Sequence, residues 1–251
     1  MNKNLSAKER IILALDMDTL EEAREVVREL KDHVGMFKVG LQLFSAVGPD
    51  VFKMIAEEGA KVYFDGKFCE IPDIAAQASA NIVRHGVDFL NINILGSSKM
   101  ISKTIKACRD VAKKAGRSNP VILGVTLLTS YGQRTLTEEL GVSLNIEDYV
   151  LKLAEIAKQN GLDGVVATAE DAIKIRKKFG DDFIIVCPAV RPTWSIVDDQ
   201  VRVVTPHDAI RSNVDYIIVG RPIRNAEDKA AAADLIAGEI LEATVDSVIE
   251  N

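Results

Sequence analysis

Residues 62–67 read Val62-Tyr63-Phe64-Asp65-Gly66-Lys67, an apolar run that leads directly into a carboxylate and an ammonium group two positions apart. Side chains alternate between the two faces of a strand, so Asp65 and Lys67 are expected on one face and Phe64 and Gly66 on the other. Charged groups that point together from the C-terminal end of a strand are typical of active sites in parallel α/β barrels. The segment therefore predicts proton chemistry beside a fixed charge.

Short β-branched runs recur along the chain, and each is followed by turn residues and a helical pattern. One such pattern runs from Leu20 to Leu30, where apolar residues return every three or four positions. Strand-then-helix repetition indicates parallel strands covered by helices, and eight strands are the number that closes a (β/α)8 TIM barrel. The expected strands are residues 11–15, 36–39, 61–64, 89–94, 121–126, 164–167, 183–187 and 216–219.

A doubly wound open sheet is the structural alternative to the barrel. No G-x-G-x-x-G or P-loop motif follows any of the expected strands, which disfavours it. No low-complexity linker divides the chain, so residues 1–251 are expected to form one domain. A C-terminal helix from about residue 227 to 249 is expected to close it.

Composition limits the classes of partner. The net charge of −6 argues against a non-specific nucleic-acid surface, although one basic pocket for a phosphate remains compatible with it. No apolar run approaches the roughly 18 residues of a membrane span, and the N-terminus lacks a signal-peptide core, so a cytoplasmic protein is expected. Cys69, Cys108 and Cys187 form no metal-binding spacing and are expected as reduced residues in or near the core. No metal site is predicted.

The C-terminal ends of the first three expected strands are unusually charged. Asp16 ends the first, Lys38 lies in the second, Asp65 and Lys67 end the third, and Glu70 begins the following loop. Most charge clusters are surface salt bridges of little consequence. Charges embedded in a strand pattern are uncommon, however, and this favours a catalytic group of residues.

Two later segments have the composition of an anion site. Gly220 and Arg221 follow the last strand, where barrels often bind phosphate: glycine permits close backbone approach and arginine offers a bidentate fork. A long polar loop, residues 188–200, follows the seventh strand and contains Arg191 and Gln200, which suggests a lid over a substrate. An ordinary strand-to-helix turn is the alternative for the first segment.

Hydroxyl groups end the fifth expected strand, at residues 125–130. Thr129 in this segment either hydrogen-bonds a planar heterocycle or caps the following turn.

Taken together, these segments resemble the orotidine 5'-phosphate decarboxylase family. The resemblance runs in order from about residue 10 to 225, and the order of several motifs makes accidental similarity improbable. The family is a cofactor-free (β/α)8 homodimer with shared active sites that converts orotidine monophosphate to uridine monophosphate. The segments are Leu15-Asp16, Phe37-Lys38-Val39-Gly40, Asp65-x-Lys67-x-x-Glu70-Ile71-Pro72, Leu128-Thr129-Ser130, Arg191-Pro192, Asp199-Gln200 and Gly220-Arg221-Pro222.

The resemblance implies roles for particular residues. Lys67 would deliver a proton to C6 as carbon dioxide leaves, with Asp65 near the substrate carboxylate. Lys38 and Asp16 would bind the ribose and complete the charge network. The other implied contacts are the pyrimidine for Thr129, the phosphate for Gln200, Gly220 and Arg221, and the closing loop for Arg191.

The chain departs from the family pattern at several of these positions. Glu70 stands where the family has a second Asp, which reaches the neighbouring subunit's site, and Asp73-Ile74 stands where Asn-Thr is usual. A displacement of about 1 Å in a catalytic group can cost on the order of 100-fold in rate. Asp73 is a candidate to take over part of the missing role. The remaining departures are Asn93 for His, Ser97 for Gly, and Ala189-Val190 for Gly-Ile.

Two other functions remain open from the sequence. Related barrel lyases act on sugar phosphates with a magnesium ion held by an acidic residue, but Lys38 occupies that position here and an ammonium group would repel the metal. A nucleotide-binding homologue with little activity is the second alternative, because of Glu70 and Ile74.

Overall fold

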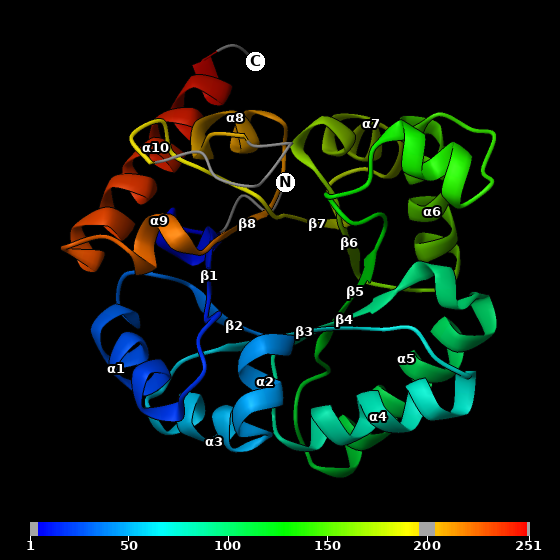
Figure 1. Ribbon diagram of the computed structural model, residues 1–251, viewed down its shortest axis with the longest axis horizontal. Coiled ribbons are helices and arrows are strands. Elements are labelled where there is room, and N and C mark those ends of the chain that lie inside the picture. The colour runs from blue at the N-terminus through cyan, green and yellow to red at the C-terminus, as the bar shows by residue number, and fades with distance from the viewer. Residues whose placement is uncertain (1–4, 196–203, 250–251) are drawn as a thin grey trace.

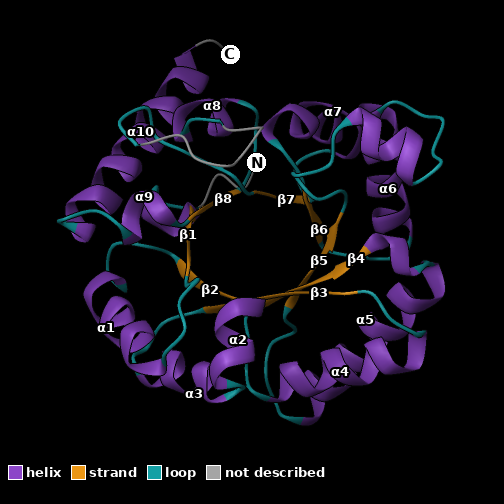
Figure 2. Ribbon diagram, viewed as in Figure 1, coloured by secondary structure: helices purple, strands orange, loops and turns teal. Residues whose placement is uncertain are grey.

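The computed structural model describes residues 5–195 and 204–249. Within them, the strands form a closed parallel barrel in sequence order, with helices arranged around it (Figures 1 and 2). This confirms the TIM barrel predicted from the sequence. The strands are β1 (Ile11–Ala14), β2 (Met36–Gly40), β3 (Val62–Phe68), β4 (Phe89–Asn93), β5 (Val121–Val125), β6 (Gly164–Val166), β7 (Ile184–Cys187) and β8 (Tyr216–Val219).

The helices form the outer ring seen in Figure 2. Several begin at an N-cap side chain: those of Thr19, Asn145 and Thr168 each accept a hydrogen bond from a backbone N–H of the first turn. The α-helices are α1 (Leu20–Leu30), α2 (Leu41–Val47), α3 (Asp50–Glu57), α4 (Pro72–Arg84), α5 (Ser98–Lys114), α6 (Ile146–Gln159), α7 (Ala169–Phe179), α8 (Pro206–Arg211), α9 (Arg221–Arg224) and α10 (Lys229–Ile249). Short turns of other helix types are η1 (Lys8–Arg10), η2 (Ile94–Gly96) and η3 (Thr135–Glu139). None of the helices in the described ranges is long and apolar enough to cross a membrane.

The apolar core has two parts, one inside the barrel and one between strands and helices. Alternation along each strand separates them: Ile12 and Ala14 on β1 point into the barrel, whereas Ile11 and Leu13 pack against helices. The interior cluster also contains Met36 on β2. Extending this alternation along β1, β2 and β3 puts Asp16, Lys38, Asp65 and Lys67 on the inward-facing side of the C-terminal mouth.

β3 is longer than the sequence pattern predicted, because it continues through Asp65 and Lys67 to Phe68. Its pairing with β4 is irregular: Phe64 lies opposite Leu90, but Phe68 lies opposite Ile92, so β3 carries two extra residues. A bulge of this kind re-aims side chains at the rim of a barrel. Gly66 is required within it, since a β-carbon there would lie 2.3 Å from the ring of Phe64.

The prediction for the cysteines is partly wrong. Cys108 and Cys187 are buried, as expected, but Cys69 is exposed. Cys69 follows the bulged end of β3 at the mouth of the barrel, where the chain has left the core.

Candidate active site

Four charged side chains meet at the C-terminal mouth of the barrel. Asp65 lies between two ammonium groups: its Oδ1 is 2.6 Å from Lys67 Nζ, and its Oδ2 is 3.3 Å from Lys38 Nζ. Lys38 Nζ also donates to Oδ1 of Asp16 at 3.3 Å. The structure thus brings together the residues predicted from the ends of the first three strands, as an alternating chain of two carboxylates and two ammonium groups.

The four charged side chains differ in how far they are exposed to solvent. The side chains of Lys38 and Asp65 are 9% and 11% exposed, whereas those of Lys67 and Asp16 are 35% and 40% exposed. Lys67 therefore presents its ammonium group to the open mouth while Asp65 and Lys38 lie behind it. Of the two ammonium groups, Lys67 is therefore the one more open to a bound molecule.

The charge state of Asp65 is set by its neighbours. Burial by itself would raise the pKa of Asp65, but the charges of Lys38 and Lys67 outweigh it, together with hydrogen bonds from Lys67 and Asn91, and the pKa of this carboxyl is lowered. Asp65 is therefore a fixed negative charge at neutral pH. Such a charge can repel a second carboxylate placed beside it.

Asn91 on β4 is a site residue that the sequence analysis missed. It is fully buried, and its side-chain amide bonds the backbone N–H of Lys67 and the carboxylate of Asp65. One signal could have identified it: a strand position that faces the barrel interior and carries an amide instead of an apolar residue.

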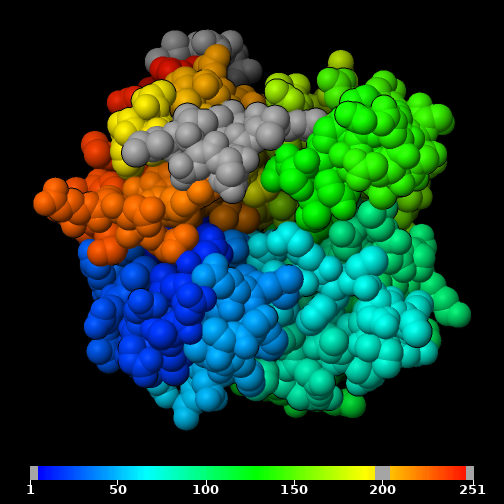
Figure 3. Space-filling view, viewed as in Figure 1, coloured from blue at the N-terminus to red at the C-terminus, as the bar shows by residue number. Residues whose placement is uncertain are grey.

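Gly220 and Arg221 lie at the same mouth, at the end of β8 and the start of α9. A β-carbon on Gly220 would lie 3.7 Å from Asp16 Oδ2, so its backbone is close to the charged chain. Arg224, one turn further on, was also missed by the sequence analysis. Its NH1 donates to the carbonyl of Asp16 at 2.6 Å, and its NH2 lies 3.8 Å from Oδ2 of the same residue. Figure 3 shows this face as a surface on which the blue, light blue and orange segments adjoin.

Arg191 lies at the start of the loop that follows β7. It is buried, its backbone N–H donates to the carbonyl of Val204 at 2.9 Å, and Val190 pairs with Val204 in a parallel bridge. The two ends of the long loop are thus held side by side. Gln200, the other residue predicted in this loop, lies outside the described residues.

Thr129 is half-buried in the turn after β5. The residue before it, Leu128, packs against the interior cluster of the barrel. Thr129 therefore lies near the mouth, in keeping with its predicted position.

Glu70 and Asp73 are not brought to the charged chain within one subunit. Glu70 is exposed, and its carboxylate accepts a hydrogen bond from the adjacent backbone N–H of Ile71. Asp73 lies on α4 and forms an ion pair with Lys103 on α5. The expectation that Asp73 replaces the second Asp of the motif gains no support from this contact, because its carboxylate is directed to a neighbouring helix.

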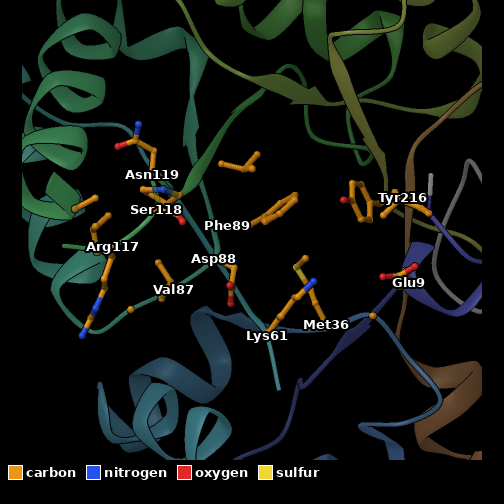
Figure 4. Close-up of a pocket in the computed structure, with 17 residues that line it drawn as sticks. Glu9, Met36, Lys61, Val87, Asp88, Phe89, Arg117, Ser118, Asn119 and Tyr216 are labelled. Atoms are coloured by element: carbon orange, nitrogen blue, oxygen red, sulfur yellow. The ribbon is translucent and has the colours of Figure 1, made fainter. Parts of the chain in front are cut away.

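A cavity of about 330 Å³ lies at the opposite, N-terminal end of the barrel. Phe89 and Tyr216 both line it and pack edge to face against each other, with their ring centroids 5.4 Å apart (Figure 4). Its rim carries both signs of charge, from Glu9, Lys61 and other residues. This cavity contains none of the predicted site residues. Across the described ranges, no group of three or more His, Cys, Asp or Glu residues could hold a metal ion.

Comparisons with known proteins agree with the geometry of the mouth. The family model "Orotidine 5'-phosphate decarboxylase / HUMPS family" matches residues 9–236. Proteins named orotidine 5'-phosphate decarboxylase from Geobacter metallireducens and Moorella thermoacetica are each 42% identical to this chain, covering 94% of it and 97% and 94% of their own lengths. The crystal structure of orotidine 5'-phosphate decarboxylase from Lactobacillus acidophilus matches with a TM-score of 0.81 and 33% identity, over 92% of this chain and 98% of that one.

Proposed function

This chain belongs to the orotidine 5'-phosphate decarboxylase / HUMPS family, and on that premise we propose that it is a carboxy-lyase of pyrimidine biosynthesis. It converts orotidine 5'-monophosphate to uridine 5'-monophosphate and carbon dioxide. The observation that carries the proposal is the alternating chain Asp16, Lys38, Asp65 and Lys67 at the mouth of the barrel, with Lys67 as the more exposed of its two ammonium groups.

The proposed chemistry follows from the position of these charges. The bond between C6 and the substrate carboxylate breaks, its electron pair stays on C6, and carbon dioxide leaves. Positive charge placed in advance beside C6 stabilises the developing carbanion, and Lys67 then transfers a proton from Nζ to C6. Asp65, held ionised by its two ammonium neighbours, repels the substrate carboxylate in the ground state. The proposed step requires no cofactor.

The proposed substrate contacts extend from this centre. Lys38 and Asp16 bind the ribose hydroxyls, Thr129 contacts the pyrimidine, and Arg191 orders the loop after β7. Gly220, Arg221 and Gln200 hold the phosphate, which lies far from C6. Binding energy from the phosphate then helps to close the loop and stabilise the transition state.

The proposed assembly is a homodimer in which Glu70 reaches the partner's site. Two observations support this: the Glu70 carboxylate contacts only its own loop among the described contacts, and Ile71 and Ile74 beside it are 64% and 56% exposed. Exposed aliphatic groups of this size, close together, favour burial against another chain. A cytoplasmic location, without nucleic-acid or membrane partners, completes the proposal.

The sugar-phosphate lyase alternative is not favoured. Lys38 Nζ lies 3.3 Å from carboxylate oxygens of both Asp16 and Asp65. It therefore occupies the position between these carboxylates in which a divalent cation would have to bind. An ammonium group there opposes metal binding.

The test follows the ultraviolet change of orotidine 5'-monophosphate with the purified full chain. Lys67→Ala serves as the blank, and Glu70→Asp is the matched variant that restores the shorter carboxylate. Turnover in the parent that Lys67→Ala abolishes supports the proposal. If neither parent nor Glu70→Asp turns over while both bind uridine 5'-monophosphate in calorimetry, the chain is a nucleotide-binding homologue instead. Activity only in Glu70→Asp would locate the defect at that carboxylate.

A further inference from the structure

The backbone of Lys67 has a conformation that its residue type disfavours. Its φ angle is +48°, in the left-handed region, which residues other than glycine rarely adopt because the β-carbon approaches the backbone carbonyl oxygen. Such a conformation persists only where the surroundings impose it. The bulge between Phe64 and Phe68 permits it, and a specific contact is needed to select it.

Asn91 supplies that contact. Its Oδ1 accepts the backbone N–H of Lys67 at 2.8 Å. The same side chain donates from Nδ2 to Asp65 Oδ1 at 2.7 Å, and that oxygen also receives Lys67 Nζ at 2.6 Å. Asn91 thus holds Lys67 at both ends, directly at the backbone and through Asp65 at the ammonium group.

The orientation of the Asn91 amide is determined by these partners. A backbone N–H can only donate, so it requires Oδ1, and an ionised carboxylate can only accept, so it requires Nδ2. Rotating the amide by half a turn would place a carbonyl against the carboxylate of Asp65. The arrangement therefore has one favourable state.

Tyr63 holds the amide from the other side. Its hydroxyl oxygen accepts the second Nδ2 hydrogen of Asn91 at 2.6 Å, and the side chain is fully buried. Burial, together with the charge of Asp65, raises the pKa of Tyr63 well above its usual value, so the phenol stays neutral. A neutral phenol is not repelled by the negative charge of Asp65, as a phenolate would be.

We infer that Asn91 is a positioning residue that sets the geometry of Lys67 and Asp65, with Tyr63 as its support. The inference rests on the proposed function, because the pair it positions is the proposed proton donor and its neighbouring charge. Asn91 is fully buried behind Lys67 and acts through these two residues, without touching the substrate.

The kinetic test compares Asn91→Ala and Tyr63→Phe with the parent. Removing the amide should lower kcat about 100-fold with KM changed by less than about threefold, because a misplacement of about 1 Å at the reacting group has that effect. Tyr63→Phe removes one hydrogen bond and keeps the ring, so kcat should fall about 2-fold to 10-fold. Thr126→Val is the matched control: it removes a buried hydrogen bond, from Thr126 Oγ1 to the carbonyl of Val166 at 2.9 Å, on the neighbouring strand end.

A second readout does not depend on turnover. The Lys67 amide should exchange its hydrogen faster in Asn91→Ala than in the parent, while amides of β1 and β8 exchange unchanged. If the parent turns over but Asn91→Ala keeps kcat within about threefold, or loses no more than Thr126→Val, the inference fails and the proposed function stands. If the parent is inactive, the proposed function fails, and an unchanged Lys67 amide in Asn91→Ala would overturn the inference independently.

Discussion

The barrel has a charge cluster at each end, and the two are built differently. At the N-terminal end, Arg176 NH2 pairs with Asp215 Oδ2 at 2.7 Å, and the remaining guanidinium N–H groups donate to the carbonyls of Gly180, Phe183 and Asn213. Asp215 Oδ2 also accepts the N–H of Ile185 at 2.8 Å. At the C-terminal end, the ammonium groups of Lys38 and Lys67 pair with the carboxylates of Asp16 and Asp65, and the Lys67 side chain is 35% exposed.

The two clusters therefore have different roles. The N-terminal cluster of Arg176 and Asp215 holds backbone segments together, and we call it the structural end; the C-terminal cluster of Asp16, Lys38, Asp65 and Lys67 is open to a ligand, and we call it the chemical end. A guanidinium whose donors are all taken by one carboxylate and by backbone carbonyls joins loops at the starts of β7 and β8 and has no capacity left for a ligand. An ammonium group bound to a single carboxylate, at an open mouth, keeps donors for a substrate. Backbone strain follows the same division: Lys67, Ser97 and Ala189, three of the four non-glycine residues with positive φ among those described, lie at the C-terminal end.

The largest expected effect is on the chemical end. Lys67→Ala should lower kcat/KM at least about 10⁴-fold, since it removes both the proton donor and the positive charge beside C6. The midpoint of urea unfolding should change little, because Lys67 is partly exposed. Steady-state kinetics and a urea titration on the same preparation check both parts. A loss of stability as large as that of the next variant would remove the contrast between the two ends.

A substitution at the structural end should lower stability and leave kcat nearly unchanged. Asp215→Asn leaves the guanidinium of Arg176 buried without its carboxylate, and breaking a buried pair typically costs about 3–5 kcal/mol of the free energy of unfolding. Below its melting temperature, the variant should keep kcat within about twofold of the parent. Calorimetric unfolding and an assay of the folded fraction provide the measurement; a selective loss of kcat would contradict the structural role.

Acid should act on the chemical end through Asp65. Its pKa is lowered in the folded state, so its contribution to stability is fully present above the unfolded Asp pKa of about 3.9 and is lost as pH falls through the lower folded value. The parent should be more stable than Asp65→Asn at pH 7, and this difference in the free energy of unfolding should narrow below about pH 4. Urea titrations between pH 7 and 3 measure it. A gap independent of pH would mean that the carboxylate charge contributes nothing.

The smallest expected effect concerns strain at the chemical end. Ala189 has φ +62°, a left-handed conformation that favours glycine. Ala189→Gly should raise the free energy of unfolding by about 1 kcal/mol, the strain relieved less the added chain entropy. Thermal unfolding measures this, with Ala167→Gly, a buried alanine outside the left-handed region, as a control that should destabilise. Equal destabilisation by both would show that position 189 carries no strain.

Much of the fold followed from local patterns in the sequence. Each strand was identified to within a few residues because β-branched runs alternate with helical periodicity, and that signal is contained in neighbouring residues. Asp16, Lys38, Asp65 and Lys67 were identifiable for the same reason, since parity along a strand and its C-terminal end together specify where a side chain points.

Tertiary structure decided which of these groups touch and what holds them. Asn91 bonds residues 24 and 26 positions away, and Arg224 bonds the carbonyl of Asp16 across 208 residues, contacts that no local pattern contains. The bulge in β3 depends on its pairing with β4, and the course of the Glu70 carboxylate depends on the backbone of its own loop. The residues of the proposed chemistry were thus readable from the sequence, whereas their geometry was set by long-range hydrogen bonds that form only when the barrel closes.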